Sequence, residues 1–442
     1  MKQSTIFGDV LIEVSRDSDK MLLNKLRKPL KPQVSRGVVE IYEEVERVFA
    51  KVRTLLTYIE DFELVTSQTR LQQYLNKIKD NGVVAIDTET TGLDVINDKL
   101  VGISLYTKGE NPIYIPMAHD YFDNNVSYDM MRQFLQVIKD KKIKVLMHNS
   151  RFDVRVLINA LGIRLNCHFD TLIGGKVLNE NEPEHNLKVL WNKYVVAGKG
   201  EPLSYNDLFN GITFNVFDPT KVVVYPCLDA LMTYELYEFQ LPFLEPTNEL
   251  CQAQDLVDTA KLFWEIEMPI IDVAISMEER GITLDEKYAK DLEISYKKNA
   301  NDIMNKIQAK ARELMPLLRN NLSSSAMSKL SNPINFDSPA QLAILFYDGL
   351  KMELDTRVIK GDSPRSTDKH ALAYLAQTYP AYAELINDIL DYKTIETLIS
   401  TFIVSLPSKV NPTTGRLHTQ WNTIGADTGR FSSKEPKQNW AL

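Results

Sequence analysis

Asp87 and Glu89 follow an apolar run rich in β-branched residues, 83–86, which predicts a buried strand. Side chains two residues apart on a strand leave the same face, so the two carboxylates are expected side by side. Like charges near a protein interior repel each other and are costly to desolvate, and a bound cation offsets that cost. The pair therefore predicts a metal site. The alternative is an acidic strand end that reaches solvent before Gly92.

A further acid opens the helix predicted after the strand at 144–147. The segment reads His148-Asn149-Ser150-Arg151-Phe152-Asp153, with Asn149 as the expected N-cap. Asp153 then lies in the first helical turn, beside the carboxyl ends of the strands, where open α/β sheets bind ligands. The alternative is an acid that only complements the helix dipole.

Tyr225 and Asp229 form a third pair, four residues apart. If this segment is helical, both side chains share one face. Pro226 suits a first helical position, which places Tyr225 at the cap. The alternative is a dipole-complementing aspartate with a tyrosine packed beside it. The four carboxylates show no basic partner in the sequence, which implies a metal site.

The elements that must position these residues suggest an α/β domain with a mixed sheet covered by helices. Strands are predicted for the run that carries Asp87 and Glu89 and at residues 100–106, 112–115 and 144–147, and helices at 67–78, 128–139, after 149 and through 239. An amphipathic helix at 38–56 is expected to pack on this domain, and long helical segments follow Pro246.

Composition allows two or three domains in 442 residues, with 44% hydrophobic and 25% charged side chains. The net charge of −8 argues against a wholly basic nucleic-acid binder, although both ends of the chain are basic. Three cysteines without CxxC spacing predict a reducing, cytoplasmic setting. A zinc site of Cys167, His168 and His185 is a minor alternative. No run of apolar residues is long enough to span a membrane.

The ordered set DTETTGL, HNSRFD and YPCLDA resembles the tyrosine-bearing DEDD 3′–5′ exonucleases, specifically the proofreading domain of family A (DNA polymerase I-like) DNA polymerases. The resemblance implies a ribonuclease H-like fold. It implies that Asp87, Glu89, Asp153 and Asp229 hold two divalent metal ions, Mg²⁺ or Mn²⁺, and that Tyr225 orients the attacking water.

Phosphodiester hydrolysis agrees with this donor set. Two cations about 3.5–4 Å apart can stabilise both the attacking and the leaving oxygen, and Mg²⁺ or Mn²⁺ prefer carboxylates. The ordinary tyrosine pKa of about 10 makes Tyr225 a poor base, which favours an orienting role. Pro226 stands where the family usually has a small residue, so the pose of Tyr225 is open.

The resemblance also implies contacts with a single-stranded DNA 3′ end. Thr88 and Leu93 belong to the stretch that lies along the terminal nucleotide in the family. Asn149 and Phe152 are further candidates, and the Phe152 ring is either a stacking surface or core.

The second half resembles the start of a family A polymerase module, a mainly helical thumb that binds primer-template duplex. Without the resemblance, a generic helical domain or a coiled-coil arm is the alternative. Segments at 335–342, 365–369, 414–422 and 428–433 carry the likeness. The implied DNA-contacting residues are Arg365, Arg416, Arg430, Ser432 and Asn439. For the last segment, the alternative is a surface β-hairpin with an unrelated arginine.

These patterns predict a basic arm and helix at 1–61, the exonuclease at 62–246 and the thumb with the start of the palm at 247–442. The resemblance ends near Asn439, before the palm carboxylates. The expectation is therefore a phage-type chain truncated before the palm, which does not polymerise alone. A split gene, an intron, a frameshift and an incomplete record are the open explanations, and a split gene would mean that a separate polypeptide supplies palm and fingers.

Two rival functions stay open at this level. One is a free-standing exoribonuclease like RNase D, which shares the tyrosine subclass. The other is a catalytically idle DNA-binding remnant.

Overall fold

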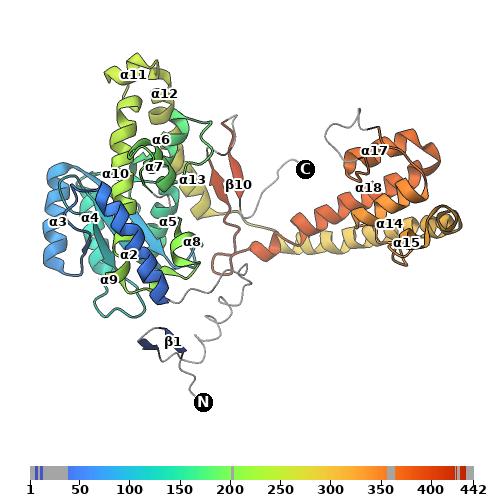
Figure 1. Cartoon of the computed structure of the whole chain (residues 1–442), viewed down its shortest axis with the longest axis horizontal. Coiled ribbons are helices and arrows are strands. Elements are labelled where there is room, and N and C mark those ends of the chain that lie inside the picture. The colour runs from blue at the N-terminus through green and yellow to red at the C-terminus, as the bar shows by residue number, and fades with distance from the viewer. Residues whose placement is uncertain are drawn as a thin grey trace. The chain divides into compact units, whose positions relative to one another are not determined.

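A six-stranded mixed sheet organises the first of two units in the computed structural model (Figure 1). The structure describes residues 5–7, 10–12, 38–200, 204–355, 364–423, 425 and 429–434. Unit 1 comprises Met1–Glu279 and Trp421–Ser432, and unit 2 comprises Arg280–Gln420 and Ser433–Leu442. The domain limits expected from the sequence stay predictions.

The sheet has the order β3-β6-β5-β4-β7-β8. Its strands are β3 (Glu63–Leu64), β4 (Val83–Thr90), β5 (Leu100–Tyr106), β6 (Ile113–Pro116), β7 (Lys144–Met147) and β8 (Cys167–Asp170). β4 pairs antiparallel with β5 and parallel with β7, so the sheet is mixed as predicted. β5 is buried along its whole length because helices cover both faces.

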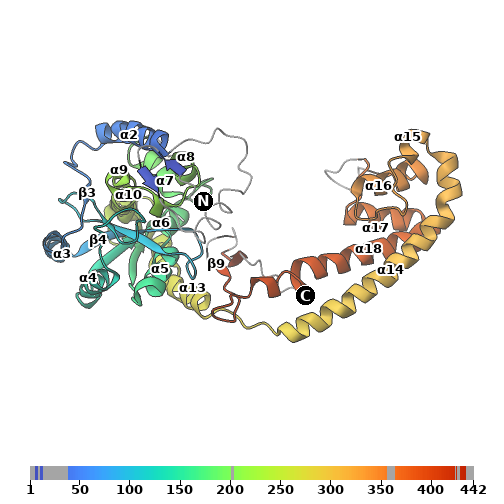
Figure 2. The same cartoon turned by 90° about the horizontal axis from the view of Figure 1, so that it is seen from below.

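Helices on the two faces come from different parts of the chain, as Figure 2 shows. One face carries α3 (Gln68–Asn81), α4 (Tyr128–Asp140) and α5 (Ser150–Leu161), and the other carries α6 (Thr171–Leu178), α7 (Leu187–Tyr194) and α10 (Val224–Leu244). Fifteen of the 21 residues of α10 are buried, because this helix is enclosed between the sheet and its neighbours. A helix that is apolar all round belongs in a core.

The helix predicted at 38–56 is observed as α2 (Val38–Leu55). Its apolar stripe, including Ile41, Val45, Val48 and Val52, is buried in the same core as the sheet. The Tyr42 hydroxyl accepts a hydrogen bond from the Asp218 backbone N–H, 2.9 Å away. α2 is therefore part of the structure that surrounds α10.

Short elements complete unit 1. They are β1 (Thr5–Phe7), β2 (Val10–Ile12), α8 (Tyr205–Phe209), α9 (Pro219–Val222), α11 (Glu249–Ala253), α12 (Val257–Leu262), α13 (Met268–Arg280), the 3₁₀ turn η1 (Phe214–Val216) and the π-helical turn η2 (Phe263–Glu267). β1 and β2 pair antiparallel. The basic segment expected to form an exposed arm, residues 13–36, lies outside the described residues.

Unit 2 is mainly helical, as predicted, with its own apolar core. Its helices are α14 (Glu286–Asn321), α15 (Ser324–Met327), α16 (Pro339–Ala343), α17 (Lys369–Thr378) and α18 (Ala383–Leu398), with the turns η3 (Ile344–Gly349), η4 (Pro380–Tyr382), η5 (Ile399–Ile403) and η6 (Pro407–Lys409). β9 (Gln420–Asn422) and β10 (Ser432–Lys434), whose residues are divided between the two units, form a two-stranded sheet. None of the helices among the described residues is long and apolar enough to cross a membrane.

Candidate active site

β4 places Asp87 and Glu89 on one face of the sheet, as their spacing predicts. Asp87 lies opposite Ser104 of β5, and Glu89 lies opposite Gly102. The register shifts between Glu89 and Thr90, where the strand ends. β4 pairs with β7 up to Ala85 and with β5 along the stretch that carries the acids, so the two carboxylates extend from a strand that the sheet holds in place.

Gly102 lets an aromatic ring lie beside Glu89. A Cβ at this position would lie 2.1 Å from the Tyr114 hydroxyl oxygen, so only glycine accommodates the ring. The Tyr114 hydroxyl bonds His119 Nε2 at 2.8 Å, and His119 Nδ1 lies 2.7 Å from the Phe217 carbonyl oxygen. A carbonyl only accepts, so Nδ1 carries the proton and Nε2 accepts from Tyr114. This buried chain of hydrogen bonds fixes the surface next to Glu89.

α10 brings Tyr225 and Asp229 to the same region. The helix begins at Val224, so Pro226 is its third residue and Tyr225 its second; the predicted start, with Tyr225 at the cap, is wrong by two residues. Proline is tolerated there because the N–H groups of a first turn have no helical partner. The Tyr225 ring packs edge-on against Phe209, with centroids 5.0 Å apart.

Asp87, Glu89 and Asp229 form an acidic cluster, in which one carboxylate oxygen of each lies within 4.8 Å of the others. Burial raises the pKa of all three carboxyls. For Asp87, the neighbouring charges of Asp153, Asp229 and Glu89 raise the pKa further. Among the residues that the structure describes, this is the one group of three or more acids, histidines or cysteines spaced to hold a metal ion. Cys167, His168 and His185 form no such group.

Asp153 reaches the cluster through Thr88. The Thr88 backbone N–H and hydroxyl both donate to Asp153 Oδ1, at 3.0 and 2.7 Å. Burial, the largest influence, raises the pKa of Asp153 to about 7, although the hydrogen bonds from Thr88 oppose the shift. Thr88 lies between Asp87 and Glu89 and faces the other side of β4, so it connects Asp153 to the strand that carries the cluster.

The start of α5 is capped differently from the prediction. Asn149 occupies the N-cap with left-handed backbone angles, φ 66° and ψ 51°, and its side chain makes no cap hydrogen bond. Instead Asp170 accepts the Asn149 N–H at 3.1 Å, and the Ser150 N–H and hydroxyl at 2.7 Å each. Asparagine tolerates the left-handed region better than most residues. The Asn149 amide is thus not needed for capping.

Lys188 is the site residue that the sequence analysis missed, and the expectation of no basic partner is wrong. Its Nζ lies 2.9 Å from the Tyr225 hydroxyl and 3.0 Å from each Asp229 carboxylate oxygen. The geometry suits a hydrogen bond to Oδ2, while buried Oδ1 has no hydrogen-bond partner. Lys188 follows the N-cap Asn186 in α7, beside the buried Leu187. No local pattern separates it from an ordinary surface lysine.

The donor set fits hard divalent cations. All candidate ligands are carboxylate oxygens, which Mg²⁺ and Mn²⁺ prefer. The Asp229 Oδ1 atom is buried without a hydrogen-bond partner, and the carboxylates of Asp87 and Glu89 lie close to it and repel it. A buried acceptor of this kind is costly unless something binds it. Asp87, Glu89 and Asp229, with Asp153 behind Thr88, are the residues that would hold such ions.

The other residues predicted to contact DNA lie in varied settings within their own units. The Leu93 side chain is 80% exposed, and Phe152 is half-buried against the core. Arg365 forms a two-point ion pair with Asp348, at 2.6 and 2.7 Å. Arg430 is exposed, Ser432 lies in β10, and Asn439 lies outside the described residues.

Arg416 lies on a turn of unit 2 that is closed by backbone pairing. Ile282 and Leu417 exchange two backbone hydrogen bonds of 2.8 Å, and Arg416 donates to the Gly281 carbonyl at 3.3 Å. A Cβ on Gly281 would lie 2.8 Å from the Leu417 carbonyl oxygen, and its φ is +62°, so both space and backbone favour glycine.

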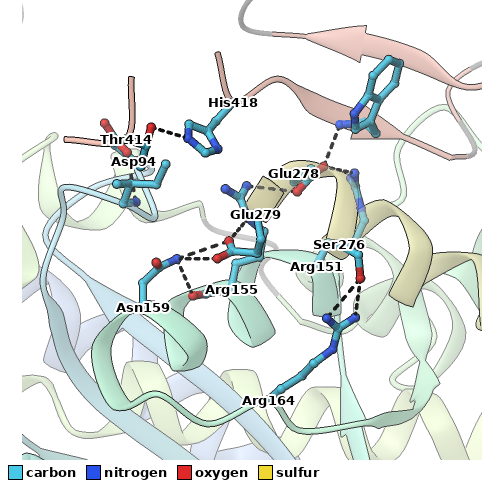
Figure 3. A network of polar contacts seen from close by, with 12 residues as sticks. Asp94, Arg151, Arg155, Asn159, Arg164, Ser276, Glu278, Glu279, Thr414 and His418 are labelled. Carbon is cyan, nitrogen blue, oxygen red and sulfur yellow. Dashed lines mark hydrogen bonds and ion pairs between the residues drawn. The ribbon is translucent and has the colours of Figure 1, made fainter. Parts of the chain in front are cut away.

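A buried ion network fixes α5, the helix of Asp153, from its outer side (Figure 3). Glu278 of α13 accepts from Arg151 at 2.9 Å and from Arg155 at 3.0 Å. The Trp421 backbone N–H donates to the same carboxylate at 2.6 Å. Arg155 also donates to Glu279 at 2.7 Å. Since Arg151 and Arg155 flank Asp153 by two residues on each side, the network restrains the turn that carries it.

Comparison with known families agrees with these two parts of the chain. Residues 62–242 match the family model described as 3′-5′ exonuclease, and residues 302–439 match the model for DNA polymerase family A. Over these two regions the chain is similar to the family A DNA polymerases. It carries an exonuclease region followed by a polymerase region.

Curated relatives include three bacterial proteins named DNA polymerase I. The chain is 28% identical to that of Pseudomonas aeruginosa over 392 residues, which cover 85% of this chain and 38% of the relative. The relative from Chloroflexus aurantiacus is 28% identical, and the match covers 84% of this chain and 36% of the relative. The relative from Synechocystis is 30% identical, and the match covers 85% of this chain and 35% of the relative. The chain thus spans less than two fifths of these relatives. They are bacterial, so they lend no support to a phage type in particular.

A solved structure shares the fold. The polymerase domain of Pol1 from M. smegmatis, in complex with DNA primer-template and dNTP, matches with a TM-score of 0.59 and 18% identity. The match covers 85% of this chain and 55% of that structure. The predicted fold class, an α/β exonuclease domain of mixed sheet followed by a mainly helical region, is therefore confirmed.

Proposed function

We propose that this chain removes nucleotides from the 3′ ends of DNA as the proofreading exonuclease of a family A polymerase. The observation that carries the proposal is the convergence of Asp87, Glu89 and Asp229, from β4 and α10, with Asp153 bound to the intervening Thr88. The same residues lie inside the region that matches the exonuclease family model. Structural ion pairs seldom gather like charges in this way.

The four carboxylates are proposed to hold two divalent cations, Mg²⁺ or Mn²⁺. When bound, these ions supply charge stabilisation for the phosphate and a nucleophile at neutral pH. Tyr225 is proposed to orient the attacking water, because its hydroxyl lies beside Asp229 through their shared partner Lys188. Burial and the neighbouring acids raise its pKa well above the ordinary value, so the phenol stays protonated and acts as a hydrogen-bonding group.

Leu93, Asn149 and Phe152 are proposed to contact the unpaired 3′ end. The exposed Leu93 side chain and the uncommitted Asn149 amide suit this role. Thr88 is better assigned to positioning Asp153, since both of its donors are used there. Its sequence-based assignment to the terminal nucleotide stays a prediction.

The polymerase-like region, residues 302–439, is proposed to bind primer-template duplex. The relative structure from M. smegmatis was solved with such a duplex, and residues 302–439 match the polymerase family model. Arg365, Arg416 and Arg430 would supply positive charge to phosphates or the minor groove, and Ser432 and Asn439 are weaker candidates. A separate polypeptide carrying palm and fingers stays a prediction from the sequence.

The test is digestion of a 5′-labelled single-stranded DNA in the presence of Mg²⁺ or Mn²⁺. We expect a ladder shortened from the 3′ end, its loss on chelation, and its loss in the double variant Asp87→Ala/Glu89→Ala. Duplex binding by that variant should match the unmutated chain. A clear preference for an RNA strand of equal sequence would favour the exoribonuclease alternative, and no digestion of either strand would favour the idle DNA-binding protein.

A further inference from the structure

Lys188 contacts two members of the site at once. Its ammonium donates to the Tyr225 hydroxyl and to Asp229 Oδ2, at 2.9 and 3.0 Å, and lies 4.1 Å from the centroid of the Tyr225 ring. Among the described residues, it is the one lysine or arginine that pairs with a carboxylate of the acidic cluster. Its side chain is only 14% exposed.

We propose that Lys188 is a positioning residue for the exonuclease reaction, which fixes the Tyr225 hydroxyl relative to Asp229 and acts as the counter-charge of the cluster when no divalent cation is bound. The inference rests on the proposed function. It assigns a role to a residue of α7 that none of the three carboxylate motifs contains.

The surroundings of Lys188 favour this role over a merely structural one. Lys188 and Tyr225 line a small, mainly apolar cavity together with Val48 and Phe49 of α2 and Leu228 of α10. An apolar side chain would fill such a place at less desolvation cost than an ammonium. The charge is therefore explained by what the ammonium touches, and the packing of α2 limits where it can point.

Orientation of Tyr225 depends on this lysine. Phe209 packs edge-on against the ring, which fixes its plane but leaves the hydroxyl hydrogen free to rotate. Because Lys188 can only donate, it occupies a lone pair of the phenol oxygen and leaves the O–H to donate elsewhere. A tyrosine held in this way can present its proton to the water oxygen or to the scissile phosphate.

Charge balance predicts a second, opposite effect. Four carboxylates, Asp87, Glu89, Asp153 and Asp229, face one lysine, so the metal-free site is short of positive charge. Divalent cations bound to the same carboxylates would be repelled by an ammonium 3.0 Å from Asp229. Lys188 therefore stabilises the metal-free protein and weakens metal binding, while it supports turnover.

The experiment compares Lys188→Met, Lys188→Arg and the control Lys193→Met in the full chain. Lys193 lies on the same helix, pairs with Glu182 at 2.7 Å and is 52% exposed. Mn²⁺ binding is measured by calorimetry, melting temperature is measured with EDTA and with Mn²⁺, and kcat and KM are measured on single-stranded DNA.

For Lys188→Met we expect Mn²⁺ to bind several-fold more tightly, a lower melting temperature in EDTA, and a larger rise in melting temperature on adding Mn²⁺. We expect kcat to fall about 10- to 100-fold with little change in KM, as for a misplaced catalytic group. Lys188→Arg keeps the charge, so its Mn²⁺ affinity should stay near that of the unmutated chain while kcat falls. Lys193→Met should leave Mn²⁺ affinity, kcat, KM and the rise in melting temperature on adding Mn²⁺ unchanged, although loss of its pair with buried Glu182 lowers the melting temperature itself.

Weaker or unchanged Mn²⁺ binding in Lys188→Met, or an unchanged kcat, would overturn the inference. If the variant does not fold in EDTA, Mn²⁺ must restore folding, and failure to do so would mean that Lys188 is merely structural. An unmutated chain that binds Mn²⁺ and leaves DNA ends intact would refute the proposed function instead. The Mn²⁺ titration would still decide whether Lys188 is the counter-charge.

Discussion

Two buried carboxylate sites in unit 1 differ in how their negative charge is balanced. Glu278, 3% exposed, receives hydrogen bonds from two guanidinium groups and one backbone N–H. Asp87, Glu89 and Asp229 share one lysine, and burial together with neighbouring charge raises the pKa of each. The first site uses protein groups to satisfy its charge. The second has more negative charge than the protein balances, which a bound cation would neutralise.

The difference separates structural from chemical carboxylates. Leaving one partner of a buried ion pair uncompensated costs several kcal/mol, so the Glu278 network is expected to be essential for stability. A cluster of like charges opposes folding until a cation binds, so its presence suggests selection for function and not for stability.

The largest expected effect comes from removing Glu278, the buried carboxylate whose charge is balanced by protein groups. Glu278→Ala leaves Arg155, 5% exposed, with its remaining partner Glu279 and removes the acceptor of the Trp421 N–H. The free energy of unfolding should fall by about 3–5 kcal/mol, measured by urea denaturation. Asp258→Ala, whose exposed carboxylate pairs with Lys261, is the control and should change stability little. Equal losses in the two variants would contradict the comparison.

The next effect concerns a buried polar group that carries no charge. Burial lowers the pKa of His119 to about 4 from the ordinary 6.5, so its folded form is neutral. The contribution to stability is complete above pH 6.5 and declines as pH falls toward 4, because the unfolded chain then binds the proton more tightly. This histidine should account for about 3 kcal/mol of acid-dependent stability.

In His119→Gln the free energy of unfolding should fall less between pH 7 and pH 4 than in the unmutated chain. Denaturant titration at each pH measures this free energy. The glutamine can keep one of the two hydrogen bonds, to Tyr114 or to the Phe217 carbonyl. Parallel pH curves for the two proteins would show that His119 does not contribute this dependence.

A smaller effect, a gain in stability, is expected from removing one charge of the acidic cluster. Asp87→Asn removes one of the like charges while preserving shape, so the metal-free protein should become more stable by about 1–2 kcal/mol. The melting temperature in EDTA should therefore rise, whereas the stabilisation by Mg²⁺ should shrink. A lower melting temperature in EDTA would mean that Asp87 has favourable interactions that outweigh the repulsion.

The smallest expected effect lies in unit 2, where Asp348 neutralises Arg365 at the surface. Asp348→Asn removes the carboxylate that neutralises this guanidinium and should tighten duplex DNA binding about two- to fivefold at low salt, since exposed pairs are weak. Arg365→Ala should weaken binding and reduce the salt dependence. Fluorescence anisotropy over a salt series measures both. Unchanged binding in both variants would remove Arg365 from the proposed DNA surface.

Local patterns predicted much of unit 1. The strands at 100–106 and 144–147 are observed at those limits, and the helices at 67–78 and 128–139 within three residues of theirs. The two strands are short, mostly apolar runs and the two helices carry apolar residues at helical spacing, so their limits depend on near neighbours in sequence. The spacing of Asp87 and Glu89 likewise determined that they share a face.

Contacts between distant residues were decided only by the tertiary structure. Lys188 reaches Asp229 across 41 residues of sequence, and Thr88 reaches Asp153 across 65. Asp170 replaced the Asn149 side chain as the cap of α5, because strand β8 ends beside that helix. A sequence period records which face of an element is apolar, but not which charged group of another element lies opposite.

The sequence alone indicated a pair of carboxylates on one strand and a single aspartate on each of two later helices. Their order along the chain resembles that of metal-dependent exonucleases. Only the tertiary structure decided how their charge is balanced. One lysine serves the acidic cluster, while two arginines serve Glu278. The physical reason is that charge balance in a protein interior is set by distance in space, which the chain closes only when it folds.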